Sequence, residues 1–145
     1  MRKILALVLV LMCAGSALCA DVAGLEREAM VLKVELAGLG NSGDPFEREA
    51  ILRKIIDKCK GTEEGEAAYW DLADLYLEGF PDEMRQEAAE MLELCLKNYP
   101  NTRRSVLVKC RLVDLYDAKD KRRTELVRQL KNESGLPTML KNSLK

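Results

Sequence analysis

Residues 62–101 read TEEGEAAYWDLADLYLEGFPDEMRQEAAEMLELCLKNYPN, and this stretch decides the fold. Apolar residues recur at spacings of three and four on either side of a turn at residues 79–82. They are Tyr69, Leu72, Ala73 and Tyr76 before the turn, and Ala88, Met91, Leu92, Cys95 and Leu96 after it. This spacing places each set on one face of an α-helix. Two such helices joined by a short turn form a hairpin that must bury both apolar faces.

The same pattern returns after a shift of forty residues. Leu72-Ala73-Asp74-Leu75-Tyr76 aligns with Leu112-Val113-Asp114-Leu115-Tyr116, and Thr62 aligns with Thr102. The shift predicts three hairpins, over residues 21–60, 61–100 and 101–140. Three units are about the minimum for a stacked array with a continuous core. Amphipathic helices of similar length also align by chance. We expect an all-α fold of stacked antiparallel hairpins, a short α-solenoid, in one domain over residues 21–145.

Capping and turn residues set the expected helix ends. The expected helices cover residues 21–39, 45–60, 62–78, 82–98, 103–116 and 121–130, with a short helix or frayed tail at 137–144. Asp44 and Pro45 are typical of a helix start, and Thr62 and Thr102 are expected to cap two later helices. Gly61 and Pro100 are expected to stop the helices before them.

Residues 1–20 have the features of a signal peptide. Arg2 and Lys3 precede an apolar run over residues 4–12, and small residues lead to Ala20. We expect cleavage and a periplasmic or secreted protein. A retained membrane anchor is the alternative, although the run only reaches the lower limit for a span. A lipoprotein signal is less favoured, because Leu18 precedes Cys19 and Met12 precedes Cys13.

Composition argues against most catalytic chemistry. The 145 residues carry a net charge of -1 and no histidine, the commonest general base and metal ligand. No phosphate-binding glycine loop, nucleophile motif or metal-ligand cluster is recognisable. We therefore expect no catalytic residue, no metal and no cofactor, and no nucleic-acid partner. A small carboxylate-dependent hydrolase of the envelope is the enzymatic alternative.

Three cysteines would remain after cleavage behind Ala20, namely Cys59, Cys95 and Cys110. Each lies on or beside an expected apolar stripe, where a thiol behaves as a small hydrophobe. An odd number leaves no complete pairing. Buried thiols are the favoured interpretation, and a Cys95–Cys110 disulfide is the alternative.

The residues Leu72-Ala73-x-Leu75-Tyr76, Gly79, Ala88 and Tyr99-Pro100-Asn101 resemble a tetratricopeptide repeat or its Sel1-like relatives. The chain departs from the family at Tyr69, where tryptophan is frequent, and in the third unit, which lacks the closing proline in register. The resemblance implies a concave surface lined by the first helix of each hairpin. It also implies a role in binding proteins or peptides, similar to that of envelope scaffold proteins.

On that resemblance, residues beside the core stripe would line a binding groove. They are Trp70, Asp74, Leu77 and Glu78 on one helix, with Leu107, Cys110, Asp114 and Asp117 as their counterparts. Trp70 is the expected anchor for a peptide, because it is an aromatic residue among carboxylates. Packing of Trp70 under the preceding helix is the alternative.

Two further features bear on partners. Acids predominate from Thr62 to Leu94 and bases from Lys97 onward, which would suit head-to-tail docking or a partner of mixed charge, or would simply be solvated faces. The seam formed by Val22, Leu25, Ala29, Leu32 and Leu36 would allow a structural homo-oligomer through a coiled coil, but packing within the domain is favoured for two heptads.

Overall fold

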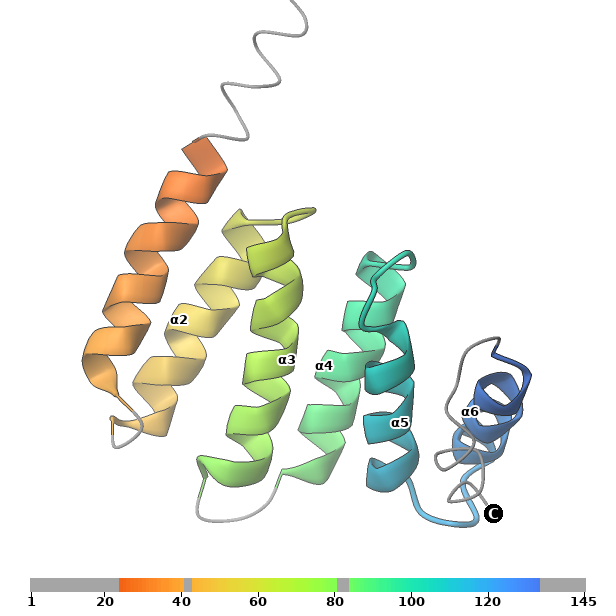
Figure 1. The fold of residues 1–145 in the computed structure, drawn as a ribbon. Helices are drawn as coiled ribbons and strands as arrows, with labels where there is room; N and C mark the ends of the chain where they lie inside the picture. Colours follow the sequence, from red (N-terminus) through yellow and green to blue (C-terminus); the bar gives the residue numbers. More distant parts are fainter. Residues whose placement is uncertain (1–23, 41–42, 81–83, 134–145) are drawn as a thin grey trace, which may run out of the picture. The chain divides into compact units, whose positions relative to one another are not determined.

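The computed structural model describes residues 24–40, 43–80 and 84–133, and its regular secondary structure there is entirely α-helical. The expected all-α fold is therefore confirmed. A first helix covers residues 24–39 (Figure 1). The others are α2 (Pro45–Lys58), α3 (Glu63–Glu78), α4 (Arg85–Asn98), α5 (Ser105–Leu115) and α6 (Lys121–Asn132).

The chain divides into two compact units between Gly65 and Glu66, within α3. The first unit contains the helix over residues 24–39, α2 and the start of α3. The second contains the rest of α3 and α4 to α6. The first unit thus holds one helical hairpin, and the second holds two.

In the first unit, the helix over residues 24–39 packs on α2. Ala29 and Leu32 are 1% and 8% exposed, and the buried residues of α2 are Ile51, Leu52 and Ile55. Lys58 donates a hydrogen bond to Glu28, and the Cys59 thiol lies 3.9 Å from the carbonyl oxygen of Leu25. Ala29 and Leu32 of the predicted seam are therefore buried within the chain, in agreement with the favoured expectation of packing inside the domain.

The caps of the first unit follow the sequence. The Asp44 carboxylate accepts a hydrogen bond from the Phe46 N–H at 3.1 Å, and Pro45 begins α2. The Thr62 hydroxyl accepts from the Gly65 N–H at 3.2 Å at the start of α3. Gly61 between these helices has φ of 81°, a conformation that favours glycine. The predicted start signals are confirmed. The helix α2 ends at Lys58, two residues before the expected end, and Gly61 lies in the turn that follows.

In the second unit, α3 and α4 form an antiparallel hairpin. The Asn98 side chain at the end of α4 donates to the Tyr69 hydroxyl near the start of α3, at 2.7 Å. At the other end, the Met84 N–H donates to the Tyr76 carbonyl at 3.0 Å. The core between them consists of aliphatic, aromatic and thiol side chains: Leu72, Tyr76, Ala88, Leu92 and Cys95 are each at most 2% exposed.

The helix α5 packs against both α4 and α6. Its buried residues are Val108, Leu112 and Val113. Val113 meets Leu130 of α6, which is 0% exposed, and Leu126 and Val127 pack around this pair.

The start of α5 differs from the prediction. Thr102 does not cap the helix, which begins at Ser105. Its hydroxyl instead accepts from the Arg104 N–H at 3.0 Å, and its carbonyl accepts from the Ser105 N–H at 3.2 Å, so that residues 102–105 form a turn. Leu107, which the sequence places beside the binding groove, is 61% exposed, and Val108 occupies the core.

Several predictions fall on parts of the chain that the structure does not describe. They are the signal peptide over residues 1–20, Val22 of the seam, the start of the expected helix over residues 82–98 and the segment over residues 137–144. In the part that it does describe, no helix is both long enough and apolar enough to cross a membrane.

Two leucines of α5 test the packing. Leu112→Ala is expected to lower the free energy of unfolding by about 2–5 kcal/mol, because Leu112 is 1% exposed and its truncation leaves a cavity. The same change at Leu107 should stay within about 0.5 kcal/mol. Urea unfolding followed by circular dichroism measures both. Equal effects of the two changes would show that the assignment of the core face is wrong.

Candidate functional site

The structure places the predicted groove residues on α3, on α5 and in the following turn. Trp70, Asp74 and Leu77 are half-buried, and Glu78, Asp114 and Asp117 are exposed. None of these six residues is part of the hydrophobic core.

Polar contacts join α3 directly to α5. Arg111 lies 3.3 Å from the Asp74 carboxylate. The Glu66 carboxylate accepts from the Thr102 hydroxyl at 2.5 Å and lies 4.0 Å from Arg104. The first helices of the second and third hairpins are therefore neighbours on this side. Arg111 offsets the charge of Asp74 there, which leaves Glu78 and Asp114 as exposed acids.

The second unit also has two adjoining hollows that share Tyr116 and Arg122. The polar hollow has a volume of about 380 Å³ and is lined by Arg85, Gln86, Ala89, Glu90, Leu115, Tyr116, Asp117, Asp120 and Arg122. The leucine hollow has a volume of about 420 Å³ and is lined by Glu93, Leu96, Leu112, Tyr116, Lys121, Arg122, Glu125 and Leu126. Of the predicted groove residues, only Asp117 lines either of them.

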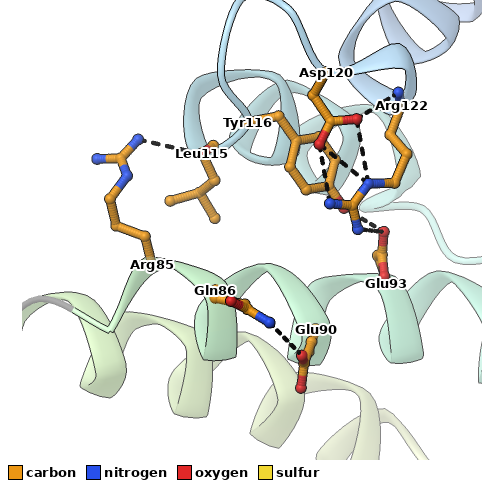
Figure 2. A network of polar contacts seen from close by, with 8 residues as sticks. All are labelled: Arg85, Gln86, Glu90, Glu93, Leu115, Tyr116, Asp120 and Arg122. Atoms are coloured by element: carbon orange, nitrogen blue, oxygen red, sulfur yellow. Dashed lines mark hydrogen bonds and ion pairs between the residues drawn. The ribbon is translucent and has the colours of Figure 1, made fainter.

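Tyr116 is the centre of a polar network between α4 and α6 (Figure 2). Its hydroxyl donates a hydrogen bond to the Glu93 carboxylate. The Arg122 guanidinium lies 4.3 Å from the centroid of the tyrosine ring, in cation–π geometry. It also lies 3.3 Å from Glu93 and 2.9 Å from Asp120. One aromatic ring and one arginine thus connect α4, the turn after α5 and the start of α6.

The network shifts the pKa values of its members. Burial, and then the hydrogen bond to Glu93, raises the pKa of Tyr116 above its ordinary value. Hydrogen bonds from the side chain and backbone of Arg122 lower the pKa of Asp120. The same Asp120 carboxylate accepts from the Arg122 N–H at 2.8 Å, which caps α6. At neutral pH the tyrosine is therefore a neutral donor and the aspartate an anion.

Arg85 binds the end of α5 from the side of α4. Its guanidinium donates to the carbonyl oxygens of Asp114 at 2.8 Å and Leu115 at 3.4 Å. These carbonyls lie in the last turn of α5, where a cation is favourable for the helix dipole. Arg85 therefore fixes one wall of the polar hollow (Figure 2).

The leucine hollow has an apolar floor and a charged rim. Leu96, Leu112 and Leu126 come from three different helices, and the rim carries both signs of charge, from Glu93, Lys121, Arg122 and Glu125. Hydrogen bonds from Arg128 and Gln129 lower the pKa of Glu125 to about 2, so it is an anion at neutral pH. This hollow can accept an apolar side chain while the rim pairs with charges beside it.

The three cysteines in the described part of the chain are free thiols. Cys59 and Cys95 are buried and Cys110 is half-buried, as the thiol interpretation expected. Burial raises the pKa of all three, and that of Cys95 reaches about 11. The reactive thiolate is therefore scarce at neutral pH. In residues 24–40, 43–80 and 84–133, no group of three or more cysteine and carboxylate side chains could hold a metal ion.

The sequence did not single out the Tyr116 network. The periodicity predicts Tyr116 as an apolar stripe residue, and it is indeed only 8% exposed. Glu93, Asp120 and Arg122 belong to separate elements, so their spacing along the chain gives no pattern. The one available signal was Asp120, an aspartate directly before the expected start of α6 at Lys121.

No protein-family model matches the sequence, and comparisons with curated proteins and with solved structures found no match. The resemblance to tetratricopeptide and Sel1-like repeats therefore stays a prediction from the residues themselves.

Tyr116→Phe tests the network. Near neutral pH it is expected to lower the free energy of unfolding by about 1 kcal/mol, because it removes a hydrogen bond to a carboxylate. The folded-state pKa of Tyr116 lies above the ordinary tyrosine pKa of about 10. The stabilisation is therefore complete below about pH 10 and is lost as the pH rises through the folded-state pKa. Urea unfolding at pH 7, 9 and 10.5 should show the difference between the two proteins narrowing above pH 10.

Tyr69→Phe is the matched control for this substitution. It removes a hydroxyl that accepts from the neutral amide of Asn98, so its effect should be smaller. No difference between wild type and Tyr116→Phe at pH 7, or a difference that widens above pH 10, would contradict the assignment.

Proposed function

We propose that this chain is a protein-binding module, a scaffold that takes up a segment of a partner protein on its second unit. The observation that carries the proposal is the leucine hollow. An apolar centre surrounded by charged groups is the usual arrangement at the energetic centre of a protein interface. The three leucines of the hollow provide apolar contact and its rim provides charges, and both can bind a side chain of a partner.

The structure of the rim supports a peptide rather than a flat partner surface. Tyr116 and Arg122 are held by Glu93 and Asp120, so the wall between the two hollows is pre-organised. A peptide with one large apolar residue between charged residues would place the apolar side chain over the leucines and its charges on the rim. The α3–α5 face, with Trp70, Asp74, Leu77, Glu78 and Asp114, remains the sequence's own candidate for a second contact.

The place of action is part of the proposal. The basic, apolar and small-residue order of residues 1–20 supports export, and the tetratricopeptide resemblance supports a scaffold role in the cell envelope. Isolation of the chain from the envelope fraction with its new N-terminus near Asp21 would support this part. Recovery from the cytosol with residues 1–20 intact would contradict it.

Selection of a displayed random-peptide library on the purified chain tests the binding function. Enriched peptides are expected to carry one large apolar residue beside charged ones. Lys121→Glu reverses the charge of an exposed rim residue. It should weaken the binding of peptides that place an acidic residue at this position about tenfold or more, since two acidic side chains would then lie opposite each other. Lys119→Glu makes the same change two residues away, outside the hollow, and should leave binding unchanged.

The outcomes separate the two surfaces. Peptides that respond to Lys121→Glu but not to Trp70→Ala bind at the leucine hollow. Peptides that respond only to Trp70→Ala would place the binding site on the α3–α5 face instead. No enrichment, or enrichment of peptides that ignore both changes, would contradict the proposed function on this unit.

A further inference from the structure

The helix over residues 24–39 carries a second apolar face, opposite the one that packs on α2. Met30, Val31 and Val34 are 70%, 67% and 68% exposed, while Ala29 and Leu32 of the same helix are buried. Within the described ranges, six large apolar residues are exposed, and these three lie within five consecutive positions. The concentration of apolar surface at one place marks an interaction surface.

An exposed apolar face on a helix promotes association with another surface. This helix has apolar residues on two sides, which is the pattern of a helix packed on two sides. One side is covered by α2. The second face therefore requires another occupant.

The residues around Val31 are arranged symmetrically. Gly24 and Gly38 each lie seven residues from it, which is two helical turns, so all three share a side of the helix. A Cβ atom at either glycine would meet nothing within 4 Å, so packing inside the chain does not require glycine there. Arg27 and Glu35, both exposed, lie four residues before and four after Val31.

We infer that the occupant is a second copy of this chain, packed antiparallel across a two-fold axis at Val31. In that arrangement Gly24 of each copy faces Gly38 of the other, which lets the two helices approach closely. Arg27 of each copy faces Glu35 of the other, so two equivalent ion pairs flank the apolar centre. The contact uses a face distinct from the one with Ala29 and Leu32 that packs on α2, and it does not depend on the leucine hollow of the second unit.

Charge reversal tests this pairing in analytical ultracentrifugation over a range of concentrations. The purified chain should form a dimer whose population rises with concentration, because a single helix pair is a small interface. Arg27→Glu and Glu35→Arg should each raise the dissociation constant about tenfold or more, since each replaces both attractive contacts by repulsive ones. An equimolar mixture of the two variants should associate again, because both contacts of the mixed dimer join an acidic side chain to a basic one.

Lys54→Glu is the control, since it reverses a charge on the exposed side of α2 and should leave the dimer unchanged. A wild-type chain that stays monomeric at every concentration would overturn the inference. Single variants that dimerise as tightly as the wild type, or a mixture that associates no better than either variant alone, would overturn it as well. The last result would indicate that the face is used in a different geometry or by a different partner.

Discussion

Within each of the two units, the structure depends on the burial of one apolar stripe per helix against a neighbouring helix. In the described part of the chain, no polar or charged residue is buried, and the most buried side chains are leucine, isoleucine, valine, cysteine and Tyr76. Most of the ion pairs have at least one exposed side chain, and exposed pairs contribute about 0–1 kcal/mol each. Burial of a leucine contributes about 1.5–3 kcal/mol. Apolar packing therefore contributes most of the free energy of unfolding, and the polar contacts favour one arrangement of the packed helices over similar ones.

This division of roles explains where binding surfaces occur. A helix with a single apolar stripe buries that stripe against its neighbours, so an apolar surface that stays exposed is a candidate binding surface. In the described part of the chain, two such surfaces are candidates: the leucine hollow, which is lined by one leucine each from α4, α5 and α6, and the second face of the helix over residues 24–39. The first is concave and ringed by charges, which suits a peptide. The second is one side of a helix, which suits another helix.

Periodicity and capping residues were enough to predict most of the fold. Asp44, Thr62 and Gly61 act through contacts with residues close in the chain, so their roles could be inferred locally. Thr102 was misassigned because its hydroxyl bonds to Glu66 of α3, a tertiary contact that no local pattern reports. Leu107 and Val108 both fit an apolar stripe, and only packing on the neighbouring helices decides between them.

The candidate sites were less accessible to sequence reasoning. The resemblance to a repeat family directed attention to α3 and α5, and the Asp74–Arg111 pair shows that these helices are neighbours. The Tyr116 network and the leucine hollow need α4, the turn after α5 and α6 together, and residues 93, 116 and 122 form no motif along the chain. Sites of this kind become visible only when the helices are in place.

The most direct test of the account is a nuclear Overhauser measurement on the α3–α4 hairpin. In this antiparallel hairpin, the side-chain amide of Asn98 lies 2.7 Å from the Tyr69 hydroxyl, and the Met84 N–H donates to the Tyr76 carbonyl. Cross-peaks between the Asn98 amide protons and the Tyr69 ring are therefore predicted, together with cross-peaks between the Met84 N–H and Tyr76. Cross-peaks that join Tyr69 to Met84 instead, or the absence of any between α3 and α4, would contradict the hairpin and the stack built on it.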